Sequence, residues 1–138
     1  MKISTFHMME ELSSAQDLRQ FVFTHKDEFF AESAHVYLGR IMEEKKISGA
    51  QLSKRAGLGN YCYMILSGAR KPSRDAALRL CIGLELDLER VQQYLRLAQL
   101  ARLDPRSRRD AAVIYALGKK MDLISVQMLL ADLGEQEL

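Results

Sequence analysis

Apolar residues recur every three or four positions along most of the chain, which is the period of a helix and not of a strand. Leu38, Ile41 and Met42 show this spacing, and charged residues fall on the opposite face of the same segment. Runs of β-branched and aromatic residues, which favour strands, are scarce. We therefore expect an all-α fold, with helices near 14–24, 26 or 33 to 46, 48–56, 60–67, 73–84, 87–100, 105–117 and 125–133.

Capping residues mark where several of these helices begin and end. Ser48, followed three residues later by Gln51, forms a capping box. Gly57 is expected to end that helix in the left-handed conformation, which glycine adopts without a Cβ clash. Asn60 suits the N-cap of the next helix. Other helix starts are expected at Ser14, Ser73, Asp87, Pro105 and Ser125.

The segment 48–67 is thus predicted to form two short helices around a tight turn. Leu52 and Ala56 share one face of the first helix, and Cys62 and Ile65 share one face of the second. These four side chains are expected to be buried together. Burying them turns the remaining large side chains of the second helix outward, namely Tyr61, Tyr63 and Met64.

Charge is distributed unevenly, although the whole chain carries a net charge of only +2. Residues 1–46 hold six bases and eight acids, and residues 81–138 hold eight bases and nine acids. Residues 47–80 hold six bases and one acid, Asp75, which is a local net charge of +5. The bases are Lys54, Arg55, Arg70, Lys71, Arg74 and Arg79. A basic patch on two short helices around a turn is typical of a duplex-DNA binder.

Other charged and aromatic clusters have simpler interpretations. Arg106, Arg108 and Arg109 lie beside acidic residues, so we expect salt bridges at a helix start and not a second nucleic-acid site. Phe29 and Phe30 are expected to pack an N-terminal arm against the rest of the chain.

Several function classes find no support in the chain. Cys62 and Cys81 lack the spacing of a zinc site or disulfide framework, and the three histidines lack metal-ligand spacing. Neither a phosphate-binding loop nor a dinucleotide motif occurs, and no segment suggests a nucleophile with its base. We expect no enzyme activity, cofactor or metal. Without an 18-residue apolar run or a signal sequence, a cytoplasmic protein with no membrane partner is expected.

Two segments carry a resemblance to a known family. They are Gln-Leu-Ser-Lys-Arg-Ala-Gly at 51–57 and Ile-Leu-Ser-Gly-Ala-Arg-Lys-Pro-Ser at 65–73, followed by leucines at 78, 80 and 84. Residues 34–99 resemble the XRE-type, lambda-repressor-like helix-turn-helix domain. Nearly the whole chain is similar to a group of small bacterial proteins of this type that are regarded as transcriptional regulators. The resemblance implies a five-helix domain at 34–100, a helical arm at 1–33 and a two-helix extension at 101–138.

The resemblance also implies which residues contact double-stranded DNA. In the family, the helix after the turn enters the major groove and its first residues read base edges. The implied DNA-binding residues are Ser48, Lys54, Arg55, Asn60, Tyr61, Tyr63, Met64, Arg70, Lys71 and Arg74. Gly49 and Met64 occupy positions where the family often has polar residues, and Asn60 is the one side chain well suited to reading a base. We therefore expect modest sequence selectivity.

Two alternatives remain open at this point. An outward surface of tyrosines and methionine also suits a protein partner, so the scaffold can serve as a protein-interaction module. The segment after Pro105 has apolar faces, Ile114 with Leu117 and Leu129 with Leu133. They can form a homodimer or cap the core of a single chain.

Overall fold

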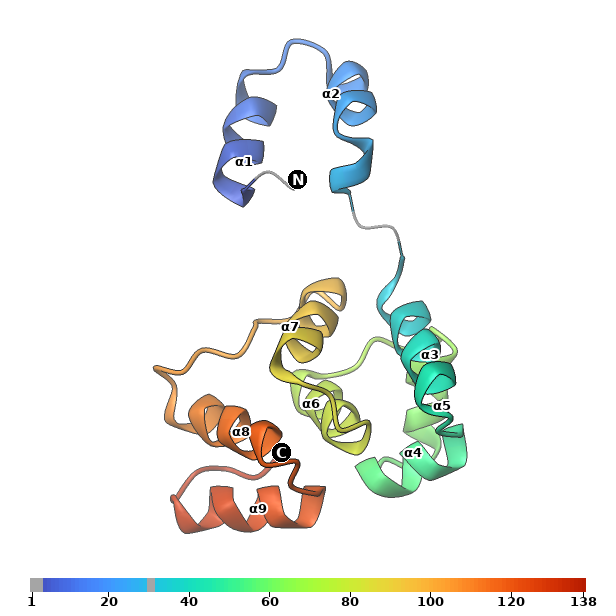
Figure 1. Ribbon diagram of the computed structural model, residues 1–138, viewed down its shortest axis with the longest axis vertical. Helices are drawn as coiled ribbons and strands as arrows, with labels where there is room; N and C mark the ends of the chain where they lie inside the picture. Colours follow the sequence, from blue (N-terminus) through green and yellow to red (C-terminus); the bar gives the residue numbers. More distant parts are fainter. Residues whose placement is uncertain (1–3, 30–31) are drawn as a thin grey trace. The chain divides into compact units, whose positions relative to one another are not determined.

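The computed structural model describes residues 4–29 and 32–138 (Figure 1), and within them all regular structure is helical, with no strand. The all-α class predicted from the periodicity is confirmed. The helices are α1 (Thr5–Ser14), α2 (Leu18–Thr24), the 3-10 turn η1 (Lys26–Glu28), α3 (Ala34–Lys45), α4 (Gly49–Ala56), α5 (Asn60–Leu66), α6 (Arg74–Gly83), α7 (Leu88–Leu97), α8 (Arg108–Gly118) and α9 (Leu123–Asp132). Contacts divide the chain into two compact units, residues 1–31 and 32–138.

The first unit contains α1, α2 and η1. The predicted cap at Ser14 is wrong, because Ser14 is the last residue of α1. A separate helix, α2, begins at Leu18 after Asp17, whose carboxylate accepts a hydrogen bond from the Arg19 amide. Within this unit the ring of Phe29 meets the ring of Phe21 edge-on, with 6.4 Å between centroids. Phe30, the other phenylalanine of the prediction, lies outside the described residues.

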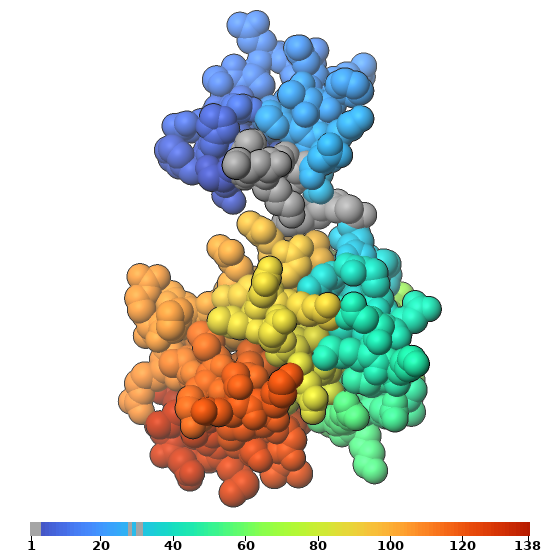
Figure 2. Space-filling model, in the orientation of Figure 1, coloured from blue at the N-terminus to red at the C-terminus, as the bar shows by residue number. Residues whose placement is uncertain are grey.

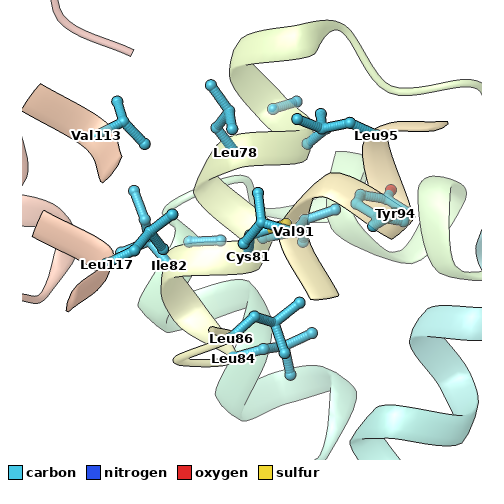
Figure 3. Close-up of a cluster of buried hydrophobic side chains, with 14 of the residues drawn as sticks. Leu78, Cys81, Ile82, Leu84, Leu86, Val91, Tyr94, Leu95, Val113 and Leu117 are labelled. Carbon is cyan, nitrogen blue, oxygen red and sulfur yellow. The ribbon is translucent and has the colours of Figure 1, made fainter. Parts of the chain in front are cut away.

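In the second unit, α6 occupies the centre. It packs against α4, α7 and α9, while α3 packs against α5 and α7 (Figure 1). Figure 3 shows the resulting core, in which Ile82 of α6 points toward Val113 and Leu117 of α8, and Cys81 of α6 lies beside Val91 of α7. Side chains fill the spaces between the ribbons of α3, α7 and α8 in the space-filling view (Figure 2).

The last two helices complete this core. Leu117 of α8 is buried, and Ile114 and Leu129 pack against the buried cluster, whereas Leu133 is 41% exposed. The apolar faces predicted after Pro105 therefore cap the core of the same chain. Two predicted helix starts in this region are wrong. Ser107, not Pro105, caps α8, and Asp122, not Ser125, caps α9.

The capping residues predicted at the starts of α4, α6 and α7 are confirmed. Ser48 and Gln51 form the complete capping box at the start of α4. The side chains of Ser73 and Asp87 accept the expected backbone hydrogen bonds at the starts of α6 and α7. Leu88, the first residue of α7, is 40% exposed, while Val91 and Leu95 of the same helix are buried. Across the described residues, no helix has the length and apolar character that a membrane span requires.

Candidate nucleic-acid interface

Helices α4 and α5 are joined by a three-residue turn and packed through buried side chains. Leu52, Ala56, Cys62 and Ile65 are all buried, as predicted. Gly57 ends α4 with φ of +65°, in the left-handed region where glycine avoids a Cβ clash. The Ser53 hydroxyl donates a hydrogen bond of 3.0 Å to the carbonyl of Gly59, the last residue of the turn. The turn is thereby held in one conformation.

The start of α5 differs from the prediction in one residue. Gly59, with φ of +57° and ψ of −138°, is the N-cap, and Asn60 is the first helical residue. The side chain of Asn60 makes no capping hydrogen bond and is exposed. The predicted cap at Asn60 is therefore wrong. Because its amide is not used by the helix, both its donor and its acceptor face solvent.

Tyr63 brings the outer face of α5 next to the start of α4. A Cβ atom built on Gly49 would lie only 3.1 Å from Cε1 of the Tyr63 ring. The aromatic ring thus occupies the space that a larger residue at position 49 would need. Ser48, the N-cap of α4, is exposed immediately before this contact. Three of the residues predicted to contact DNA, Ser48, Tyr63 and Met64, therefore lie on neighbouring exposed parts of α4 and α5.

Tyr61, in contrast, is a structural residue. Its ring is half-buried and packs against the core. Its hydroxyl donates to the Lys71 carbonyl at 3.4 Å and accepts from the Ser73 amide at 3.2 Å. The prediction that Tyr61 points outward is wrong, because its hydroxyl ties α5 to the loop at residues 67–73. This loop carries two of the predicted basic residues.

The loop holds Arg70 and Lys71 beside the end of α5. The Arg70 amide donates to the Met64 carbonyl at 3.1 Å. Gly68, with φ of +82°, approaches His35 of α3 so closely that a Cβ would lie 2.7 Å from the imidazole ring. Arg70 and Lys71 are exposed, and neither side chain has an ion-pair or hydrogen-bond partner among the described residues. Their charges are therefore uncompensated.

Lys54 and Arg55 lie in a different place. Both line a cavity of about 670 Å³ with residues from the end of α6 and the start of α9, including Glu85 and Leu123. Arg55 also donates a hydrogen bond of 3.3 Å to the carbonyl of Gly83. The predicted basic patch is thus divided between two cavities. Lys54 and Arg55 line this one, whereas Arg70 and Lys71 line another together with His35.

The Arg74 guanidinium is hydrogen-bonded to other residues of the second unit. Its guanidinium forms a two-bond ion pair with the carboxylate of Asp110, at 2.9 and 2.8 Å. Its remaining donors reach the carbonyls of Ala101 and Arg102. Because four of its five N–H groups have partners, Arg74 does not have a free guanidinium for a phosphate. The prediction that Arg74 contacts DNA stays a prediction, but its guanidinium is already bonded within the fold.

Two further residues of the basic segment have partners in the chain. Arg79 donates to the carbonyls of Ala56 and Gly57, so it holds the end of α4 against α6. Asp75, the one acid of the segment, pairs with Arg109 of α8 at 2.9 Å. Sequence patterns could not identify these pairs, because the partners lie 22 to 34 positions apart.

The second basic cluster forms salt bridges, as predicted. Arg106 pairs with Asp104 at 2.9 Å, and Arg108 lies 3.6 Å from Glu135. Asp110, the acidic residue that directly follows this cluster, pairs with Arg74 and not with a member of the cluster.

No metal or thiol chemistry emerges from the described residues. Within them, no group of three or more histidines, cysteines or carboxylates could hold a metal ion. Cys62 and Cys81 are buried, and burial raises the pKa of both thiols.

Comparison of the chain with models of known protein families, with curated proteins and with solved structures found no match.

Proposed function

We propose that the second unit is a lambda-repressor-like helix-turn-helix domain that binds duplex DNA and acts as a transcriptional regulator. The observation that carries the proposal is the pair of uncompensated cations, Arg70 and Lys71, held beside the exposed face of α5. Elsewhere in the basic segment, Arg74 and Arg79 are bonded within the fold. Cations that remain unpaired next to a short exposed helix are suited to phosphates on either side of a groove.

In this proposal each exposed residue has a separate role. The first turn of α5 enters the major groove, where the free amide of Asn60 can pair with an adenine. Met64 and the Tyr63 ring offer apolar contact to a thymine methyl or a sugar. The N-terminus of α4 at Ser48 lies beside a phosphate, because free backbone amides there attract anions. With one polar reader, sequence selectivity is modest.

The proposal predicts a specific dependence on salt. Each phosphate neutralised by a cation contributes about 0.9 to the slope of log affinity against log salt concentration. Arg70→Ala/Lys71→Ala should therefore weaken binding to all sequences alike and reduce the slope by about 2. Arg106→Ala/Lys119→Ala removes the same charge from exposed positions of the second unit and should leave the slope unchanged. Fluorescence anisotropy with labelled duplexes at several salt concentrations measures both.

Selection of genomic fragments at two salt concentrations tests the whole proposal. An enriched motif that the double variant no longer retains supports it. If the wild-type chain retains no fragment even at about 50 mM salt, where phosphate contacts are strong, the DNA-binding proposal is refuted.

A protein-interaction module is the second candidate function. It is favoured by the exposure of Tyr63 and Met64, at 48% and 42%, because aromatic residues and methionine are enriched in protein interfaces. This candidate predicts that Tyr63→Ala/Met64→Ala abolishes capture of a specific protein, while Arg70→Ala/Lys71→Ala leaves capture intact. The DNA proposal predicts that both double variants weaken retention on DNA.

A further inference from the structure

The N-terminal unit exposes nearly all of its apolar side chains. Among residues 4–29, Phe21 is the one buried hydrophobic residue. Phe6 and Phe23 are 71% and 73% exposed, and the Lys26 ammonium lies 5.3 Å from the centroid of the Phe23 ring. The other exposed apolar residues of the unit are Met9, Leu12, Leu18, Val22 and Phe29.

The exposed residues of α1 form a stripe that does not face α2. Phe6, Met9 and Leu12 follow each other at intervals of three, so they lie along one side of the helix. The contact between α1 and α2 is made on another side by polar groups. There the Glu11 carboxylate accepts from His7 and from His25, the residue that follows α2. The Glu11 carboxylate and the two imidazoles therefore join the helices away from the stripe of Phe6, Met9 and Leu12, which is exposed.

A unit of this kind needs an additional source of stability. Folded units below about 40 residues usually depend on disulfides, metals or oligomerisation, because they bury too little apolar surface. Both cysteines of the chain lie outside residues 1–31. The described part of the unit also contains no group of side chains that could hold a metal ion. Association through the exposed apolar side chains of the unit can supply that stability.

We infer that the N-terminal unit pairs with the same unit of a second chain. A whole phenylalanine side chain has about 150–250 Å² of surface, so the three phenylalanines and four aliphatic residues, each 43–73% exposed, together present on the order of 700 Å². Each partner of a standard protein interface contributes about 800 Å². The area is therefore what a stable dimer needs. Pairing two such units brings four helices together, the smallest common bundle with an apolar centre.

Charge is compatible with self-association. The unit carries both signs, with three bases and five acids in residues 1–31. Glu10 on α1 and Arg19 on α2 are both exposed, and their side chains have no partners among the described residues. In a two-fold pair, a contact between α1 of one chain and α2 of the other occurs twice, so opposite charges can face each other twice.

Helix α9 of the second unit has a pair of exposed apolar side chains for comparison. Ile124 and Met128 on α9 are 72% and 63% exposed, one helical turn apart. They provide a matched control, since replacing them removes two exposed apolar side chains of similar size from the other unit. The inference does not depend on DNA binding, and it is tested without DNA.

Sedimentation velocity of the full chain at about 5–200 μM tests the inference, because that range brackets the affinity of a weak dimer. The wild type should reach twice the 15.7 kDa mass of the single chain. Phe6→Ser/Met9→Ser should raise the dissociation constant at least about tenfold, whereas Ile124→Ser/Met128→Ser should leave it unchanged. A wild type that is monomeric throughout overturns the inference, as does an equal effect of the two double variants.

A cross-linking measurement remains informative even if the serine variant unfolds the first unit. Met9→Cys places a thiol in the exposed stripe, while the two native thiols are buried. Mild oxidation should link Met9→Cys chains into covalent dimers, and Ile124→Cys chains should stay unlinked. If Ile124→Cys links as efficiently as Met9→Cys, the surfaces do not meet as inferred and the pairing is refuted.

Discussion

Removal of the Asp110 carboxylate should destabilise the second unit strongly. Asp110 is 6% exposed and accepts three hydrogen bonds, two from Arg74 and one from the Asp104 amide at 3.0 Å. In Asp110→Ala the Arg74 guanidinium, with 25% of its side chain exposed, keeps its charge but loses its counterion. An unpaired charge in a buried position costs about 3–5 kcal/mol.

The partial exposure of Arg74 reduces this value, because water can solvate part of the orphaned charge. We therefore expect a loss of about 2–3 kcal/mol in the free energy of unfolding. For a unit of this size that corresponds to a fall of about 10 °C in melting temperature. Urea and thermal unfolding of the full chain, followed by circular dichroism at pH 7, measure both quantities.

The exposed pair of Arg106 and Asp104 is the control. Their side chains are 89% and 45% exposed, and Arg106→Ala should have no measurable effect on unfolding. Equal effects of Arg106→Ala and Asp110→Ala, or a loss below about 1 kcal/mol in Asp110→Ala, would contradict the reasoning.

The contribution of Asp110 should also depend on pH. Burial by itself raises the pKa of Asp110, but the hydrogen bonds from Arg74 and the Asp104 amide and the charges of Arg74 and Arg109 outweigh it. The net pKa is therefore lower than the ordinary value of 3.8. The stability that the carboxylate provides is fully present above that ordinary value and is lost as pH falls through the lower, folded-state pKa. The difference between wild type and Asp110→Ala should be constant near neutral pH and shrink only in strong acid.

Two further predictions concern the turn and the thiols. Gly59→Ala should destabilise the chain by about 1–3 kcal/mol, because its positive φ is strained for any residue with a Cβ. Gly118 is the control, because a Cβ built there also meets open space, but Gly118 is the last residue of helix α8 and has no positive φ; Gly118→Ala should therefore be neutral or stabilising. Similar unfolding free energies for the two variants would refute the backbone argument. Burial raises the pKa of the Cys62 and Cys81 thiols, so at pH 8 both should react with a disulfide reagent only as fast as the chain unfolds. Rapid reaction of either thiol in the folded protein would show that it is not buried.

Local sequence signals determined the helical class and much of the segment that contains α4 and α5. A capping box joins residues three positions apart, and a buried stripe joins residues three or four apart, so both can be read from the chain alone. Ser48 with Gln51, Leu52 with Ala56, and Gly57 are examples. The interactions that produce these features join residues within one or two helical turns of each other.

Cap choice between neighbouring residues was less well determined. Asn60 and Ser125 have good capping side chains, yet Gly59 and Asp122 occupy the N-cap positions. Several residues near each helix start are chemically suited to the role. The backbone conformation decides which one takes it, because an N-cap residue has non-helical φ and ψ, as Gly59 and Asp122 do.

Only the tertiary structure decided which cations are free. From the chain, Arg70 and Arg74 are equivalent members of one basic segment. Folding places Arg74 against Asp110, which is 36 positions away, and leaves Arg70 in solvent. Likewise, nothing near Tyr61 in sequence indicates that its hydroxyl anchors the loop at Lys71. Composition determines how many charges a segment carries, but their compensation depends on partners that are distant in the chain and become neighbours only when the helices pack.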